Sequence, residues 1–289
     1  MVGPVRFALN HIAAPRQSLP GLMQTALALG IDAIELRNDL PGVAINDGTP
    51  PADVRDLSES QDIALASINA LYPFDVWNDA RAAQACRLAD YAAECGAAGV
   101  VLCPLNEADS RDAATRAAQL RVALGALAEI FRARGVLGFV EPLGFATSAL
   151  RRKRDAVTAI DAVGGGDVLH LVHDTFHHHL AGDDDMYPHR TGIVHISGVA
   201  DAIPVAAMRD GHRGLIDAAD RLGNIDQIRR LRAGGYRGCF SIEPFAADVQ
   251  THPDIVAALR RTIDFVNREV AAAPVPADVD VNNAGELTR

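Results

Sequence analysis

The stretch Leu169-His-Leu-Val-His-Asp-Thr-Phe-His-His-His179 decides how the rest of the chain is interpreted. Its first five residues are mostly apolar and contain no glycine or proline, which predicts a short buried strand. Asp174 falls where this strand should end, and His177 follows three residues later. A carboxylate and an imidazole are costly to bury at a strand end unless they are paired or bind a metal. The stretch therefore predicts a functional strand end.

Three further strand-like segments end in the same way. Glu141 closes the segment that begins at Gly138, His195 lies in Ile193-Val-His-Ile, and Glu243 closes the segment that begins at Cys239. Both glutamates are followed by proline, which holds the preceding residue extended and ends the strand there. We interpret Glu141, Asp174, His195 and Glu243 as one divalent-metal site.

Strand-like and helix-like segments alternate along the chain. We expect strands at residues 5–9, 33–37, 63–68, 99–103, 137–140, 169–173, 193–196 and 238–242. We expect helices at residues 20–29, 52–61, 80–95, 113–134, 149–163, 225–233 and 254–270, and a polar loop after His177. Continuous apolar strands indicate a parallel sheet that is covered on both faces. Eight such units predict an α/β fold, a closed (β/α)8 TIM barrel.

The domain organisation follows from this pattern. We expect residues 1–272 to form a single barrel domain, and residues 273–289, which are rich in Pro, Asp and Asn, to form a disordered C-terminal tail. The first strand–helix turn lacks a G-x-G-x-x-G motif, which disfavours a dinucleotide-binding fold.

Charge and composition exclude several classes of protein. The 289 residues carry a formal net charge of −10 and no basic stripe, so we expect no nucleic-acid partner. The four cysteines form no CxxC pair, which indicates free thiols in a reducing compartment. We find no signal peptide and no apolar run of the roughly 18 residues that a membrane span needs. We therefore expect the protein to be cytoplasmic and to have no membrane partner.

A metal would explain why three acids gather in one place. In a barrel, the carboxyl ends of all strands face one mouth, so these side chains should be neighbours. Three carboxylates close together repel one another, and a divalent cation removes that conflict. Three oxygen donors with one imidazole suit Mn, Zn, Co or Mg. The alternative is that each acid caps a helix or pairs with an arginine.

Five further residues are candidates for substrate contacts. His177 could donate to a hydroxyl or a carbonyl, and Arg213, on the excursion after the seventh strand, could reach over the mouth. Glu35, Asn69 and His11 end earlier strands and could line the pocket wall. Each has a structural alternative, as part of a polar network or as a surface residue.

Several motifs together resemble a known family. They are Glu-Pro-Leu-Gly from residue 141, His-Asp-Thr-Phe-His-His-His from 173, Val-His-Ile-Ser-Gly from 194 and Ser-Ile-Glu-Pro-Phe from 241. These resemble the xylose isomerase-like TIM barrels, the sugar phosphate isomerase/epimerase family, and within it the 2-keto-myo-inositol (inosose) isomerases. The resemblance spans residues 5–270. It implies the metal ligands named above and substrate contacts from His177 and Arg213. Ketose 3-epimerases often carry a carboxylate where this chain has Thr147, which disfavours ketose epimerisation.

The resemblance implies a metal-dependent isomerase or epimerase that acts on a keto-polyol or keto-sugar through an enediolate. Glu141 or Glu243 would move the proton, and the substrate would be an inosose of inositol catabolism. A ketose 3-epimerase or a hydroxypyruvate isomerase-like enzyme is an alternative. An abasic-site endonuclease-like barrel and a non-catalytic sugar-binding barrel are the other classes. A homodimer or homotetramer is compatible with the family.

Overall fold

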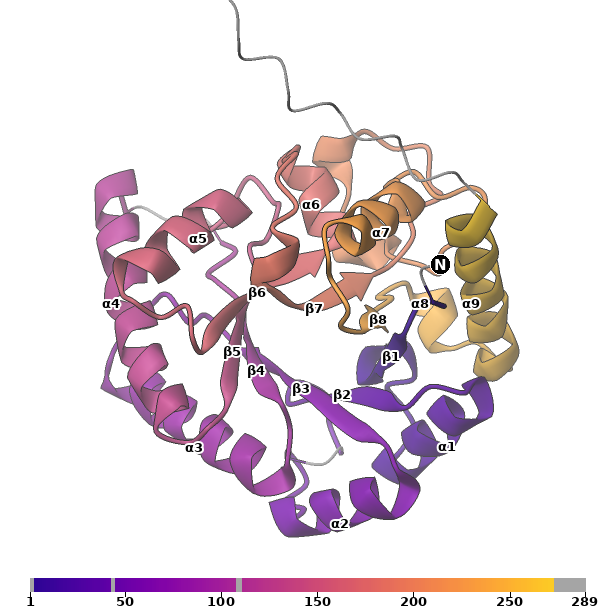
Figure 1. The fold of residues 1–289 in the computed structure, drawn as a ribbon, viewed down its shortest axis with the longest axis horizontal. Coiled ribbons are helices and arrows are strands. Elements are labelled where there is room, and N and C mark those ends of the chain that lie inside the picture. Colours follow the sequence, from indigo (N-terminus) through magenta and orange to yellow (C-terminus); the bar gives the residue numbers. More distant parts are fainter. Residues whose placement is uncertain (1–2, 43–44, 108–110, 273–289) are drawn as a thin grey trace, which may run out of the picture.

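Eight parallel strands form a closed ring in which each strand pairs with the next and β8 returns to β1 (Figure 1). The computed structural model describes residues 3–42, 45–107 and 111–272. The strands are β1 Phe7–Asn10, β2 Ala33–Arg37, β3 Ala64–Leu71, β4 Gly99–Leu102, β5 Leu137–Val140, β6 Leu169–Asp174, β7 Thr191–Ile196 and β8 Phe240–Ile242. The expected (β/α)8 TIM barrel is confirmed.

Helices follow the strands and form an outer ring around the barrel (Figure 1). They are α1 Leu19–Leu29, α2 Pro51–Gln61, α3 Asp79–Cys95, α4 Ala113–Arg132, α5 Lys153–Ala162, α6 Thr175–Ala181, α7 Asn224–Ala233, α8 Ala247–Gln250 and α9 Ile255–Ala272. Most of these bounds lie within two residues of the sequence prediction. Helix α5 instead begins four residues later than expected, at Lys153.

The segment after Asp174 corrects one prediction. We expected a polar loop after His177, but helix α6 continues to Ala181. The helix forms because the Asp174 side chain accepts hydrogen bonds from the backbone N–H groups of Phe176 and His177, at 2.7 and 3.0 Å. These are first-turn donors that have no partner inside a helix. Gly182, with a φ of 59°, then ends the helix in the left-handed region.

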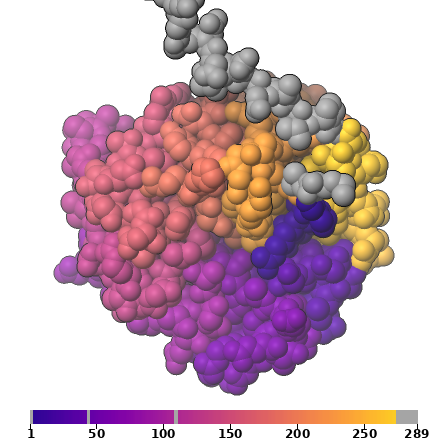
Figure 2. All heavy atoms as spheres, in the orientation of Figure 1, coloured from indigo at the N-terminus to yellow at the C-terminus, as the bar shows by residue number. Residues whose placement is uncertain are grey.

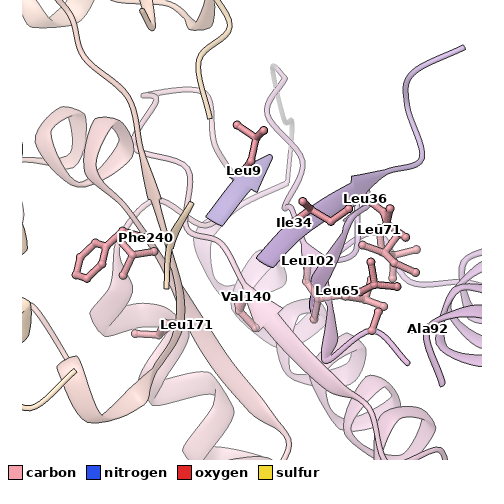
Figure 3. Close-up of a cluster of buried hydrophobic side chains, with 14 of the residues drawn as sticks. Leu9, Ile34, Leu36, Leu65, Leu71, Ala92, Leu102, Val140, Leu171 and Phe240 are labelled. Atoms are coloured by element: carbon pink, nitrogen blue, oxygen red, sulfur yellow. The ribbon is translucent and has the colours of Figure 1, made fainter. Parts of the chain in front are cut away.

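The main hydrophobic core lies between the strands and the helices. It is a continuous cluster of buried side chains from the barrel and from the surrounding ring. Figure 3 shows part of it, with Leu36, Leu65 and Leu71 of neighbouring strands gathered on the side of Ala92 in α3. Because every strand is covered by helices on this face, the strands need apolar residues at the outward positions as well as inside the barrel.

A second, smaller cluster fills the barrel interior. Its buried members are Val101, Phe139, Val172 and Ile193. Alternate residues of a strand point to the same face. Glu141, Asp174 and His195 each follow one of these apolar residues by two positions, so they point inward one layer higher. The apolar cluster thus forms a floor that separates the polar side chains from the lower end of the barrel.

The two ends of the described chain meet on one face of the molecule. The indigo N-terminal segment lies across this face beside the orange and yellow C-terminal part (Figure 2). Val5 N donates to Asn267 Oδ1 of α9 at 3.3 Å, which adds to the β1–β8 pairing. No helix in the described ranges combines the length and apolar character that a membrane crossing requires. The tail expected at residues 273–289 lies outside the described residues.

Candidate metal centre

Four side chains from successive strands meet above the floor of the barrel. Asp174 ends β6, His195 lies in β7, and Glu141 and Glu243 directly follow β5 and β8. One ligand atom of each lies within 4.8 Å of the corresponding atoms of the others, and all four residues are buried. Asp174 and His195 are also direct partners in the β6–β7 register. The structure therefore brings together the four residues that the sequence singled out.

His195 stands at the centre of this group. Its Nδ1 lies 3.0 Å from Glu141 Oε1 and 3.3 Å from Glu243 Oε2, whereas its Nε2 lies 3.1 Å from Glu35 Oε2. Burial alone would lower the pKa of His195, but Glu243, Glu35 and Glu141 together raise it well above its ordinary value. The imidazole is thus surrounded by negative charge on both sides.

The two carboxylate oxygens of Asp174 have different hydrogen-bond partners. Oδ1 caps α6, as described above, and this fixes the carboxylate relative to the helix. Oδ2 lies 4.0 Å from His195 Nδ1 and accepts a hydrogen bond from Arg213 Nη2 at 2.6 Å. The helix-cap and arginine-pair alternatives are therefore both true of Asp174, and its second oxygen still faces the other ligand atoms.

Glu243 is held by donors on both of its oxygens. Oε1 accepts from Asn10 Nδ2, Asn69 Nδ2 and Arg37 Nη1, at 3.2, 3.1 and 3.0 Å. Oε2 accepts from Arg213 Nη2 at 2.8 Å. Burial acts to raise the pKa of Glu243, but the cationic neighbours lower it overall. Three donors on one carboxylate oxygen leave it little capacity to accept another proton.

Glu141 is much less constrained. Its Oε1 faces His195, and its Oε2 accepts a hydrogen bond from the Cys103 thiol, with a Sγ–Oε2 distance of 3.2 Å. Burial and the nearby Glu141 carboxylate raise the pKa of Cys103 well above its ordinary value, so the thiol stays protonated and remains a donor. The two glutamates of the site are therefore not equivalent.

A cavity of about 370 Å³ opens above these side chains. Its lining includes Glu141, Glu243, Asn69, His177 and Arg213 from the predicted set. It also includes Arg37, Asn38, Asp39, Ala70, Tyr72, Cys103, Asn106, Glu107, Leu143, Phe145, Asp210 and Phe245. The volume suits a small polar molecule of sugar size.

Comparison with known proteins identifies the family of this barrel. Residues 23–268 match the family model described as "Xylose isomerase-like TIM barrel". The chain belongs to the xylose isomerase-like TIM barrel family. No curated protein matches the sequence at a significant level.

Solved structures of similar barrels agree with this family. A xylose isomerase domain containing protein from Salmonella typhimurium LT2 is 30% identical, with 92% of this chain and 98% of that chain covered and a TM-score of 0.84. The IolI protein with a bound zinc atom is 19% identical, with 92% and 100% covered and a TM-score of 0.81. An L-ribulose 3-epimerase is 19% identical, with 92% and 95% covered and a TM-score of 0.66.

The charges of this xylose isomerase-like barrel fit a divalent cation. Among the described residues around the site, Glu35, Glu141, Asp174 and Glu243 are buried carboxylates, while Arg37 and Arg213 are buried guanidiniums. The acids therefore exceed the arginines by two before the proton on His195 is considered. Carboxylate oxygens and an imidazole nitrogen that face one another at this spacing could bind a metal ion.

Three of the five predicted substrate contacts line the cavity of this family member. They are Asn69, His177 and Arg213. The buried Nδ1 of His177 forms no hydrogen bond with any described residue. Its ring packs edge-on against Phe145, with the ring centroids 5.2 Å apart.

The other two lie elsewhere than expected. Glu35 is fully buried below the cavity against His195, and His11 is turned away, with its Nε2 2.9 Å from the backbone oxygen of Gln17. Neither is among the residues that line the cavity. The sequence prediction placed both at strand ends, but Glu35 lies in the middle of β2 and His11 directly follows β1.

Sequence reasoning also missed residues that surround the candidate ligands. Arg37 contacts Glu243, and Cys103 contacts Glu141. A signal for both was present, because Arg37 lies two residues beyond Glu35 on β2 and Cys103 directly follows β4. Phe245 stands in the quoted motif Ser-Ile-Glu-Pro-Phe, but its contacts with the arginines could not be predicted, because it lies in a loop after β8 whose path depends on tertiary contacts.

Proposed function

We propose that this protein is a divalent-metal-dependent isomerase of an uncharged keto-polyol, with 2-keto-myo-inositol as the substrate to test first. The observation that carries the proposal is the convergence of four buried ligand atoms within 4.8 Å at the base of a sugar-sized cavity. Family membership and the inosose isomerase-like motifs support the same reaction class. The zinc atom in the IolI structure, a similar barrel, supports a bound metal in this protein.

The cavity charges favour a neutral substrate. Among the described lining residues, the arginines are Arg37 and Arg213, and both are already paired. Arg37 binds Asp39 through two hydrogen bonds and also Glu243. Arg213 binds Asp174 and Glu243 and lies 3.3 Å from an oxygen of Asp210. A phosphate or carboxylate group is normally held by an arginine or lysine that can turn its donors to the ligand. This argues against sugar phosphates and against the hydroxypyruvate isomerase-like alternative.

Glu141 is the residue that we assign as the base. When bound, a divalent cation would polarise the substrate carbonyl and stabilise the enediolate that forms on proton loss. Glu141 would remove the proton from the carbon that bears the hydroxyl group and return it to the neighbouring carbon, while the hydroxyl proton passes to the former carbonyl oxygen. Glu243 is less suited to this step, because arginine and asparagine donors occupy its oxygens. General acid–base help of this kind contributes about 10² to 10⁴-fold.

His177 and Asn69 would orient the substrate. His177, which lines the cavity, could bind a substrate hydroxyl through its ring. Asn69 presents its amide beside Glu243, at the cavity wall. Phe145, which packs against His177, would exclude water from that side of the cavity.

The test is an assay for isomerisation in deuterium oxide with added Mn²⁺, Co²⁺ or Zn²⁺. We expect interconversion of 2-keto-myo-inositol and 1-keto-D-chiro-inositol, with no turnover of phosphorylated ketoses or hydroxypyruvate. Glu141→Gln should lose at least about 100-fold in rate. The proposal fails if no neutral keto-polyol shows turnover or exchange of its α-proton, or if a phosphorylated substrate reacts faster.

A ketose 3-epimerase is the second candidate. The observation in its favour is that both Glu141 and Glu243 line the cavity, so a base could in principle stand on each side of the substrate. Conversion of a free ketose to its C3 epimer, with Glu141→Gln and Glu243→Gln equally impaired, would favour this reaction over the isomerase. Binding of abasic DNA, or the absence of bound metal and of proton exchange, would instead favour the endonuclease-like or sugar-binding alternatives.

A further inference from the structure

Glu35 occupies an unusual position for a charged residue. It lies in β2 with no exposed surface, below the cavity and beside His195. Its Oε2 receives hydrogen bonds from Ser67 Oγ at 2.5 Å and is 3.1 Å from His195 Nε2. Its Oε1 receives hydrogen bonds from Asn10 Nδ2 at 3.1 Å and from Ser241 Oγ. These donors come from β1, β3, β7 and β8, so one carboxylate is fixed by four other strands.

The environment keeps Glu35 ionised. Serine and asparagine donors compensate the charge, as a buried carboxylate requires. A fully buried anion that is satisfied in this way acts on the cavity through the groups that it contacts, among them His195 and Asn10, and Asn10 also donates to Glu243.

The contact determines which nitrogen of His195 is available. A carboxylate accepts only, so the Nε2 atom that faces Glu35 must carry a proton. Nδ1 faces the carboxylates of Glu141 and Glu243 and carries a proton as well while no cation is bound; a bound cation would take the place of that proton and leave Nε2 protonated toward Glu35. In many metal sites, a histidine ligand donates its other N–H to a carboxylate in the same way, which fixes the ring and its tautomer.

We propose that Glu35 is a positioning residue that holds His195 with Nδ1 toward the cation, and that it contacts neither the cation nor the substrate. This inference rests on the cation site of the proposed function. Loss of such a partner typically lowers metal affinity about 10- to 100-fold. A residue that served only to join strands would affect stability without this loss of affinity.

The first test compares two variants by titration calorimetry with Zn²⁺ or Co²⁺ alone. Glu35→Gln keeps the size of the side chain and removes its charge, and we expect its metal affinity to fall by about 10- to 100-fold. Ser241→Ala is the matched control, because it removes a donor to the other oxygen of Glu35 and leaves the His195 contact in place. We expect its affinity to stay within about threefold of wild type. Equal affinities for wild type and Glu35→Gln, or equal losses in both variants, would overturn the proposal.

A second measurement needs no variant and covers the case in which Glu35→Gln does not fold. In protein labelled with 15N-histidine and loaded with 113Cd²⁺, the nitrogen that binds the metal shows a scalar coupling to it. We expect the coupling at Nδ1 of His195 and a proton on Nε2. Coupling at Nε2 would overturn the proposal while leaving the metal site intact. Failure of wild type to bind any of these cations would overturn both this inference and the metal dependence of the proposed function.

Discussion

The ring of Phe245 lies over the guanidinium of Arg213, with 4.6 Å between the ring centroid and Cζ. The same ring is 5.3 Å from Cζ of Arg37, and the ring of Phe176 is 5.2 Å from Cζ of Arg213. The backbone N–H of Phe245 also donates to the carbonyl oxygen of Arg213 at 2.7 Å. Phe245 therefore contacts both arginines that bind Glu243, and joins the loop after β8 to the excursion after β7.

Replacing Phe245 with leucine should impair catalysis more than substrate binding. Cation–π contacts of this kind contribute about 0.5–2 kcal/mol each, and their loss would loosen both arginines around Glu243. We expect kcat to fall about tenfold with a smaller change in KM, measured by steady-state assay of the keto-polyol. Phe245→Tyr, which keeps an aromatic face, should retain most of the activity. Equal kcat values for the leucine and tyrosine variants would contradict this role.

Gly144 should not tolerate a side chain. A Cβ atom at this position would lie 2.1 Å from the backbone oxygen of His177 and 2.8 Å from Cβ of Leu180. Gly144→Ala must therefore push α6 away from the loop after β5. We expect a loss of about 1–3 kcal/mol in the free energy of unfolding, together with reduced activity because His177 moves. Urea denaturation and the isomerase assay would measure both effects.

Gly125 provides the control for that substitution. It lies inside α4, and the nearest atom to an added Cβ would be Val163 Cγ1 at 3.9 Å. Because glycine is a poor helix former, Gly125→Ala should be neutral or stabilise the protein by up to about 1 kcal/mol. If Gly125→Ala destabilised the protein as much as Gly144→Ala, the steric explanation for Gly144 would be wrong.

Lys153 should make stability depend on pH. It is buried at the start of α5, with its Nζ 2.9 Å from His173 Nδ1. Burial lowers the pKa of Lys153 from 10.5 to about 7. Between these values the unfolded chain holds a proton that the folded chain has released. The contribution of Lys153 therefore makes the folded state more stable as pH rises from about 7, by at most about 1.4 kcal/mol per pH unit.

The comparison with Lys153→Met isolates this contribution from other titrating groups. We expect the methionine variant to gain most over wild type at pH 7 and below, and to lose that advantage gradually as the pH approaches 10.5. Urea midpoints at several pH values, measured for both proteins in the presence of chelator, give the difference. Parallel curves across this range would show that the lysine is not desolvated as the structure indicates.

Removing divalent metal should lower the thermal stability of the protein, because the proposed cation binds only where the folded chain brings its four ligands together. A ligand that binds only the folded state stabilises it by about 2.7 kcal/mol at a concentration 100 times its Kd. We expect added Zn²⁺ or Mn²⁺ to raise the Tm of wild type and EDTA to reverse the change. In His195→Gln the Tm should respond much less. A wild-type Tm that is indifferent to metal and chelator would count against the cation site.

The sequence by itself was sufficient for the barrel and for the four candidate ligands. A strand's burial and its end are local properties, visible in Leu169–Asp174 from apolar content and in Glu141 and Glu243 from the proline that follows each. Once eight strand–helix units are recognised, barrel closure places all carboxyl ends at one mouth. The convergence of residues far apart in sequence then follows from topology.

Tertiary structure decided what the neighbouring residues do. Glu35 and His11 lie on or directly after strands like the ligands do, but the depth and direction of their side chains depend on how the strands are staggered around the ring. The aromatic contacts of Phe245 arise between two loops whose paths local sequence does not encode. Charge pairing inside the barrel is likewise a property of many strands at once, because a buried ion is stable only where several distant donors reach it.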